Sequence, residues 1–132
     1  MTIERTVNQK LLLASDLAAN GSGPWIDLGD DVPIAGLVAG ILVAASGGGV
    51  DLKVRLEHTA APTVAGAEAI FREFNDGAAL AAAGWVPISS TSPPQRYVRL
   101  TVTNYSKGNI IAGVSTSIRT VLVLKTDVVF EQ

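Results

Sequence analysis

Apolar and polar residues alternate along two stretches of the chain, and this alternation predicts β-strands. In residues 50–57 and again in residues 95–103, aliphatic residues occupy every second position. A period of two is that of a strand with one buried and one exposed face. A slip of one residue in the second stretch would bury Arg99, so the aliphatic row sets the register. The residues expected to face the core are Val50, Leu52, Val54, Leu56, Val98, Leu100 and Val102.

Shorter apolar stretches, separated by turns rich in Gly, Pro and Asn, predict further strands. They cover residues 11–13, 25–28, 37–45, 68–74, 85–88, 110–118, 119–124 and 125–132. Residues 37–45 are apolar on both faces, which is typical of a strand covered on both sides, with a helix as the alternative. The Ser46–Gly49 turn that follows predicts a hairpin with the strand at 50–57. Pro87 places its short strand at a sheet edge or bulge.

These elements predict an all-β protein, a two-sheet antiparallel β-sandwich with a jelly roll as the favoured topology. A chain of 132 residues and 13.7 kDa is long enough for one domain with one core. We expect an N-terminal arm over residues 1–10 and the sandwich domain over residues 11–124. Residues 125–132 are expected to be a C-terminal extended arm or a final strand. Residues 78–83 are rich in alanine but too short for a helix of their own.

Composition predicts an assembling protein. Hydrophobic residues make up 48% of the chain and charged residues 17%, which excludes a disordered tail and leaves more apolar surface than a small monomer can hide. The formal net charge is −2 and no two Lys or Arg residues are adjacent, so the basic patch expected of a nucleic-acid-binding protein is missing. The sequence therefore predicts association with protein and not with nucleic acid.

Membrane insertion and thiol chemistry are not predicted either. The longest apolar run, residues 34–45, is about a dozen residues long, whereas a membrane-spanning helix needs about 20. The chain has no cysteine, so thiolate catalysis, a zinc–thiolate site and disulfides are excluded. The first residues do not have the basic and then apolar pattern of a signal peptide, and we expect an intracellular product.

The sequence shows no pattern of a catalytic, cofactor or metal site. His58, the only histidine, ends an alternating strand, and no G-x-S-x-G motif accompanies it. Asp27, Asp30 and Asp31 could offer carboxylates to an ion, but their spacing is not that of an EF-hand loop and their composition is that of a turn. Residues 46–49 lack the Lys and Ser/Thr of a phosphate-binding loop. We expect no enzyme, no cofactor and no small-molecule ligand, and leave open whether an ion binds near the aspartates.

Two further groups of residues could bind a ligand. Arg96, Arg99 and Arg119 could converge on an anionic partner, although scattered Arg residues on a sheet face are more often solvated or paired locally. Four aromatic residues could build a platform for a sugar, but two Trp in 132 residues is ordinary core usage. They are Trp25, Trp85, Tyr97 and Tyr105.

Residues 96–103 (Arg-Tyr-Val-Arg-Leu-Thr-Val-Thr), followed by Gly108 and residues 111–114 (Ile-Ala-Gly-Val), resemble the capsid cement (decoration) proteins of tailed bacteriophages. The order of elements is similar as well. An apolar segment and a Trp-Ile-Asp-Leu-Gly strand at residues 25–29 precede an apolar strand and then an alternating strand at residues 50–56. In pattern, the resemblance covers most of the chain.

The resemblance implies a jelly-roll homotrimer that sits on an assembled phage head and bridges major capsid subunits. The partners would be further copies of the chain and the major capsid protein, on the capsid surface of a virion, after synthesis in the host cytoplasm. Such a clamp needs a rigid scaffold, apolar patches and extended arms, and no catalytic group. The residues expected at interfaces are Ala78, Leu80, Trp85, Tyr97, Arg99, Val128, Val129 and Phe130. A phage tail or baseplate subunit and a jelly-roll carbohydrate-binding module stay as alternatives.

Overall fold

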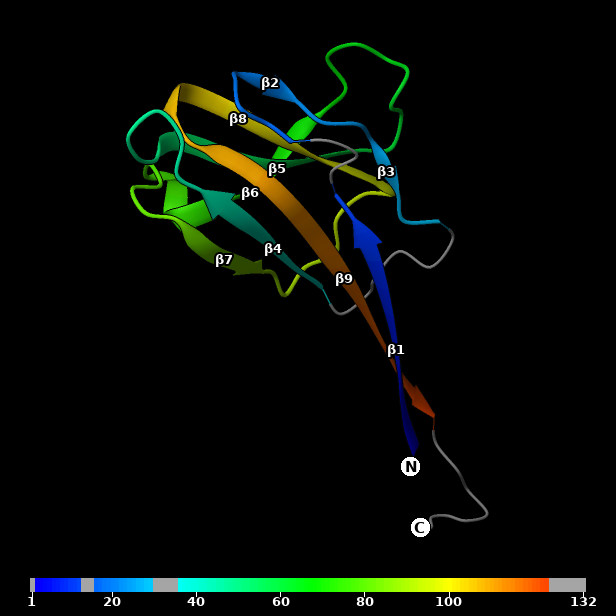
Figure 1. Cartoon of the computed structure of the whole chain (residues 1–132). Coiled ribbons are helices and arrows are strands. Elements are labelled where there is room, and N and C mark those ends of the chain that lie inside the picture. The colour runs from blue at the N-terminus through cyan, green and yellow to red at the C-terminus, as the bar shows by residue number, and fades with distance from the viewer. Residues whose placement is uncertain (1, 13–15, 30–35, 124–132) are drawn as a thin grey trace.

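The computed structural model describes residues 2–12, 16–29 and 36–123, with strand pairing alone for residues 2–11 and 116–123. Within these residues, two antiparallel sheets pack face to face (Figure 1). The first sheet consists, in spatial order, of β1 (Thr2–Leu11), β9 (Asn109–Val123), β4 (Leu37–Ala44) and β7 (Gly84–Ser89). The second consists of β2 (Gly21–Ser22) and β3 (Ile26–Asp27), both on β8 (Tyr97–Lys107), then β5 (Asp51–Thr59) and β6 (Ala69–Glu73), which leads into the short 3₁₀ turn η1 (Phe74–Gly77).

The order of the strands is that of a jelly roll. The short strands β2 and β3 lie one after the other along β8 and act as two parts of one strand. Two connections stay within the second sheet, from β2 to β3 and from β5 to β6. Every other connection joins strands of different sheets. The first strand, β1, lies beside the last, β9. An all-β sandwich of this topology is what the sequence predicts.

The core lies between the sheets and is built from the predicted aliphatic rows. All seven residues expected to face inward are buried: Val50, Leu52, Val54, Leu56, Val98, Leu100 and Val102. Leu100 reaches across to the first sheet, where Gly113 of β9 leaves room for it. A Cβ added at Gly113 would lie 2.9 Å from Leu100 Cδ1 and 3.4 Å from Ile41 Cγ2. Interdigitation at this distance fixes how closely the two sheets approach.

The predicted hairpin between residues 37–45 and 50–57 is wrong. The turn itself forms, because the Ser46 N–H donates to the Gly49 carbonyl at 2.9 Å and the two glycines between them have positive φ. However, β4 pairs with β9 and β7, whereas β5 pairs with β8 and β6. A glycine-rich turn predicts a change of direction, but it does not determine which sheet the next strand joins.

The residues predicted as an N-terminal arm form a strand. Residues 2–11 form β1, which pairs with β9 from Thr2 opposite Val123 to Leu11 opposite Val114. Strand β9 is continuous where the sequence predicts two strands, at 110–118 and 119–124. The prediction for residues 125–132, including Val128, Val129 and Phe130, lies outside the described residues.

The short strands predicted at residues 68–74 and 85–88 are confirmed, and so is the edge position of Pro87. Residues 68–74 contain β6, and residues 85–88 lie in β7, which is at one edge of the first sheet. The strand predicted at residues 11–13 is not confirmed, because Leu11 ends β1 and Leu12 lies beyond it. The alanine-rich residues 78–83 contain no helix. They pass over one end of the sandwich, where the Leu80 N–H donates to the Leu52 carbonyl at 2.8 Å.

The role of Leu100 in joining the sheets gives a stability prediction. We expect Leu100→Ala to lower the free energy of unfolding by about 2–5 kcal/mol, because it removes buried methyl groups and leaves a cavity. Denaturant unfolding followed by circular dichroism measures this. The matched control is Val64→Ala in an exposed loop, where 56% of the residue is already in contact with solvent, and a change within about 0.5 kcal/mol is expected. Equal effects of the two changes would contradict the assigned core.

Candidate functional site

The described members of the predicted interface lie in three places, which are the outer face of each sheet and, for Leu80, the core. Trp85 is 56% exposed on the outer face of the first sheet, close in sequence to the exposed Ala78. Tyr97 and Arg99 lie on the outer face of the second sheet, since their neighbours Val98 and Leu100 point inward. These residues therefore do not form one surface.

Leu80 is corrected from an interface residue to a core residue. It is only 4% exposed and packs in the same cluster as Leu52 and Phe74. Its backbone is held by the hydrogen bond to Leu52, so its side chain faces the interior while the alanines around it stay outside. Alternation within residues 78–83 gives no signal for this, because alanine is compatible with either side.

The outer face of the first sheet is a continuous apolar surface, which we call the Trp85 face. The register places Leu42 opposite Trp85 on one side and opposite Ala112 on the other. Residues directly opposite in antiparallel strands share a face. The members of the Trp85 face are Val38, Gly40 and Leu42 of β4, Trp85 and Pro87 of β7, and Ala112 and Val114 of β9. None of them carries a charge.

Gly40 lets the indole of Trp85 lie flat across this face. A Cβ at Gly40 would lie 2.0 Å from Trp85 Cζ2, so no other residue at position 40 is compatible with this ring position. Beside it, Val38 is 39% and Leu42 36% exposed. At the end of the face, β9 contains a bulge, because Leu42 pairs with Ala112 and Val43 pairs with Ile110. The extra residue, Ile111, is 41% exposed. Large apolar groups thus remain in contact with solvent.

The sequence contained a signal for this surface. Residues 37–45 were interpreted as a strand covered on both faces, and the inner face is buried as expected, with Ile41 and Val43 nearly inaccessible. The outer face of β4 is equally apolar but is not covered to the same extent. An exposed sheet face of this composition marks an interaction site, so the second cover has to be sought outside the described part of one chain.

The outer face of the second sheet has a different character, because its charges are satisfied within the chain. Glu57 is only 3% exposed. Its Oε1 accepts from Arg99 Nε at 2.8 Å and its Oε2 accepts from Arg55 Nη2 at 2.7 Å. The guanidinium of Arg99 also lies 4.2 Å from the centroid of the Trp25 ring, in the range of a cation–π contact. Arg99 is thus engaged on two sides and is not open to an anionic partner.

Sequence alternation placed Glu57 outward, which is right, but did not indicate that it is buried. Burial by itself raises the pKa of Glu57, yet side-chain hydrogen bonds from Arg99, Thr101 and Arg55 outweigh it and hold the pKa below its ordinary value of 4.5. Arg99 and Thr101 come from β8, which is distant in sequence, whereas Arg55 lies two residues before Glu57 on the same face of β5. The alternation along β5 could have indicated Arg55, but not the partners on β8.

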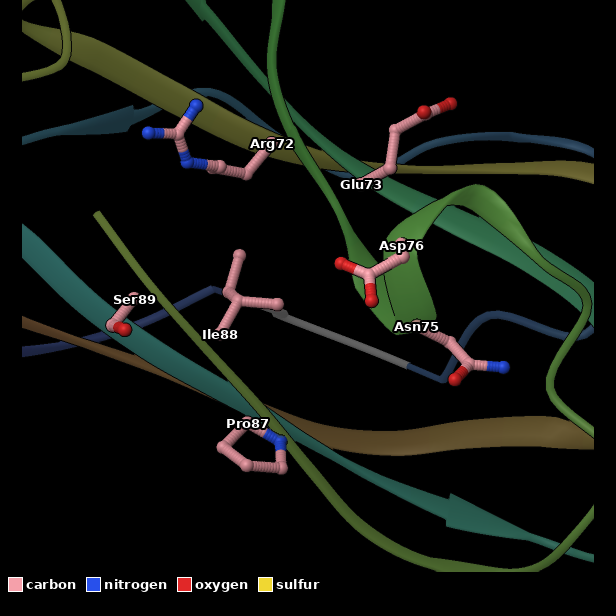
Figure 2. A pocket seen from close by; sticks show the side chains of 7 residues that line it. All are labelled: Arg72, Glu73, Asn75, Asp76, Pro87, Ile88 and Ser89. Carbon is pink, nitrogen blue, oxygen red and sulfur yellow. The ribbon is translucent and has the colours of Figure 1, made fainter.

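A cleft of about 390 Å³ opens between the edges of the two sheets, where β6 and η1 face β7 (Figure 2). Asn75 and Asp76 at its rim have positive φ values of 56° and 52°, a conformation that these two residue types tolerate. The residues that line it are Arg72, Glu73, Asn75, Asp76, Pro87, Ile88 and Ser89. It contains no histidine or cysteine, and its charged groups offer no arrangement of nucleophile and base.

The other candidate ligand groups are held by local contacts. His58 Nδ1 accepts from the Gln95 N–H at 3.0 Å, and burial lowers the pKa of His58 below 6.5. Asp27 pairs with Arg96 at 2.7 Å, while Asp30 and Asp31 lie outside the described residues. In the part of the chain that is described, no three His, Asp or Glu side chains gather as a metal site. No helix there is long and apolar enough to cross a membrane.

The four aromatic rings do not form one platform. Trp25 packs on Arg99 over the second sheet, whereas Trp85 lies over Gly40 on the opposite side of the sandwich. The Tyr105 hydroxyl donates to the Gly108 carbonyl at 2.9 Å. A sugar in contact with one Trp could not reach the other.

Comparisons of the chain with protein-family models, curated protein sequences and solved structures find no match. The function therefore has to be inferred from the chain's own residues, and the Trp85 face is the candidate site.

The charge network at Glu57 predicts a pH dependence of stability. Because the folded-state pKa is lowered, the ionised carboxylate stabilises the fold fully above the unfolded-state pKa, and this contribution is lost as the pH falls through the lower, folded-state pKa. We expect Glu57→Gln to lower the free energy of unfolding by about 1–3 kcal/mol at pH 7. The difference from the unaltered chain should begin to shrink as the pH falls below the unfolded-state pKa of about 4.5. It should be lost below the lower folded-state pKa, where the Glu57 carboxyl is neutral like the amide of Gln.

Denaturant unfolding at a series of pH values measures this difference, and the exposed Glu73→Gln is the matched control. A Glu57→Gln effect that is the same at pH 7 and at pH 3 would show that the carboxylate charge is not what stabilises this face.

Proposed function

We propose that this chain is a virion structural protein, a capsid decoration (cement) protein that forms a homotrimer and stabilises a phage head by bridging major capsid subunits. The observation that carries the proposal is the uncovered Trp85 face on a jelly-roll scaffold. Strand β4 is apolar on both sides, but Val38 and Leu42 of its outer row remain exposed while its inner row is buried. An outer row of this kind is stabilised when further copies or a shell of other subunits cover it.

The rest of the described chain suits a clamp. A protein that holds other subunits together needs a rigid body and surfaces that exclude water, and the sandwich provides both. On the outer face of the second sheet, Glu57 forms ion pairs with Arg55 and Arg99. This leaves the first sheet as the side for association. We propose no enzymatic activity, no cofactor and no nucleic-acid partner, and a location on the capsid surface.

A tail or baseplate subunit would need the same scaffold and the same apolar face, so it is the second candidate. The carbohydrate-binding alternative is not favoured by the arrangement of the rings, since Trp25 and Trp85 lie on opposite faces. Purified heads and purified tails of the virus that encodes the chain distinguish the first two candidates. Binding to tails alone would replace the head assignment with the tail assignment.

Self-association is testable directly by sedimentation. We expect the purified chain to sediment with a mass three times its 13.7 kDa, because burial of the Trp85 face favours the assembled form. Sedimentation velocity over a wide range of concentrations measures this mass. A single species of 13.7 kDa at every concentration would contradict self-association.

Capsid binding is tested with expanded heads that lack the chain. We expect added chain to bind them at saturation and to raise the temperature at which they break open, since bridging contacts oppose separation of capsid subunits. Deletion of residues 128–132 should weaken binding or the trimer, because the sequence predicts this tail as a contact arm. Particle-based light scattering during heating reports both effects. Unchanged behaviour on both counts would remove the tail from the proposed contacts.

A further inference from the structure

The first sheet extends beyond the sandwich as a two-stranded ribbon. Strand β9 pairs with β4 only as far as Ser117, opposite Leu37, but continues to pair with β1 up to Val123. Among the described residues, 2–7 and 118–123 therefore pair only with each other, and we call them the ribbon. Figure 1 shows β1 and the end of β9 projecting together away from the body. Six residues of strand span about 20 Å.

The ribbon needs cover that the described chain does not provide. An isolated two-stranded ribbon is at best marginally stable in water, and stability requires a third strand or a packed face. The register places Ile3 opposite Leu122 and Val7 opposite Ile118, and aliphatic residues are half of the twelve. Cross-strand aliphatic pairs of this kind favour packing against another apolar surface.

The Trp85 face is such a surface, but the ribbon cannot reach the one on its own chain. The ribbon begins beyond the Leu37 end of β4, whereas Trp85 pairs with Leu42, five residues along β4 in the opposite direction. That separation is about 17 Å at the rise of a strand, and the ribbon runs further away from it. Contact between the two therefore requires a second copy of the chain.

We propose that the ribbon of one copy packs on the Trp85 face of the next copy. The inference rests on the self-association proposed above and adds which two surfaces meet, independently of any capsid contact. Each copy then gives one ribbon and receives one, an arrangement that a reciprocal pair and a ring of heterologous contacts both satisfy. Heterologous contacts close into rings when the rotation permits, and three copies make the smallest ring beyond a pair.

The alternative in which two Trp85 faces pack on each other leaves both ribbons bare. The ribbon contact uses both uncovered surfaces of each copy. It also brings the aliphatic pairs of the ribbon onto a face whose members carry no charge.

Engineered disulfides test the contact, and the absence of native cysteine makes the result unambiguous. A chain with cysteine in the ribbon is mixed with a chain that carries Leu42→Cys, and the mixture is oxidised gently. Because successive strand residues alternate between faces, Ile3→Cys and Glu4→Cys are both used for the ribbon. We expect one of the two to form a disulfide with Leu42→Cys in at least several-fold excess over Val64→Cys, the exposed loop control.

Each outcome has a distinct meaning. If Leu42→Cys chains cross-link mainly with each other, the faces pair with themselves and the ribbon contact is wrong. If the unaltered chain sediments as an oligomer while neither ribbon variant cross-links above the control, self-association stands but the ribbon contact falls. If the unaltered chain is a monomer at every concentration, the proposed self-association fails as well.

A charge placed on the face provides an independent measurement. We expect Leu42→Glu to shift the sedimenting mass from the oligomer to the monomer, since the carboxylate would have to be buried beneath the ribbon. Val64→Glu should leave the oligomer intact. Circular dichroism of both variants confirms that the sandwich is folded. A Leu42→Glu chain that remains fully oligomeric would overturn the assignment of the face.

Discussion

The aliphatic side chains packed between the two sheets are the constraint on which the rest of the structure depends. Each buried Leu or Val of these rows contributes roughly 1.5–3 kcal/mol through removal from water, and Leu100 interlocks with the opposite sheet at Gly113. Because the period of a strand is two, fixing the inner rows also fixes what lies outside. Arg99 and Glu57 must face outward on one sheet, and Leu42 and Trp85 must do so on the other.

The side chains on the two outer faces differ in character and in how far they are paired within the chain. On the second sheet, Glu57 is surrounded by Arg55 and Arg99, and Trp25 covers the guanidinium of Arg99. Beside this network, Ile70 opposite Glu57 is 50% exposed. On the first sheet the outer row is apolar and exposed around Trp85. The two outer faces therefore differ, with paired charges at the centre of one and exposed apolar side chains at the centre of the other.

Much of this fold could be predicted from sequence because alternation is a local property. The inner rows of β5 and β8, the strand at Trp85 and the edge position of Pro87 all follow from residues within a few positions of each other. The partners of Glu57 on β8, Arg99 and Thr101, could not be predicted, because they are distant in sequence, whereas Arg55 is two residues away on the same strand. The wrong hairpin at Ser46–Gly49 has the same cause, since sheet membership depends on pairing with distant strands such as β8 and β9.

The candidate site shows the same division. The sequence indicated Trp85, and it indicated that both faces of residues 37–45 require cover, but not that one of the covers is missing from the described chain. Leu80 was assigned to the surface because alanines surround it, whereas its contact with Leu52 is determined by the crossing of the chain over the end of the sandwich. The pairing of β1 with β9 likewise depends on two segments more than a hundred residues apart.

Pro87 has a consequence for how large an assembly can grow. It lies near the middle of β7, the edge strand of the first sheet, and a proline on an edge lacks the N–H that an incoming strand would need. Addition of strands at this edge, the route by which open sheets polymerise into fibrils, is therefore interrupted. Copies that associate through the Trp85 face would therefore not extend this edge into a continuous sheet.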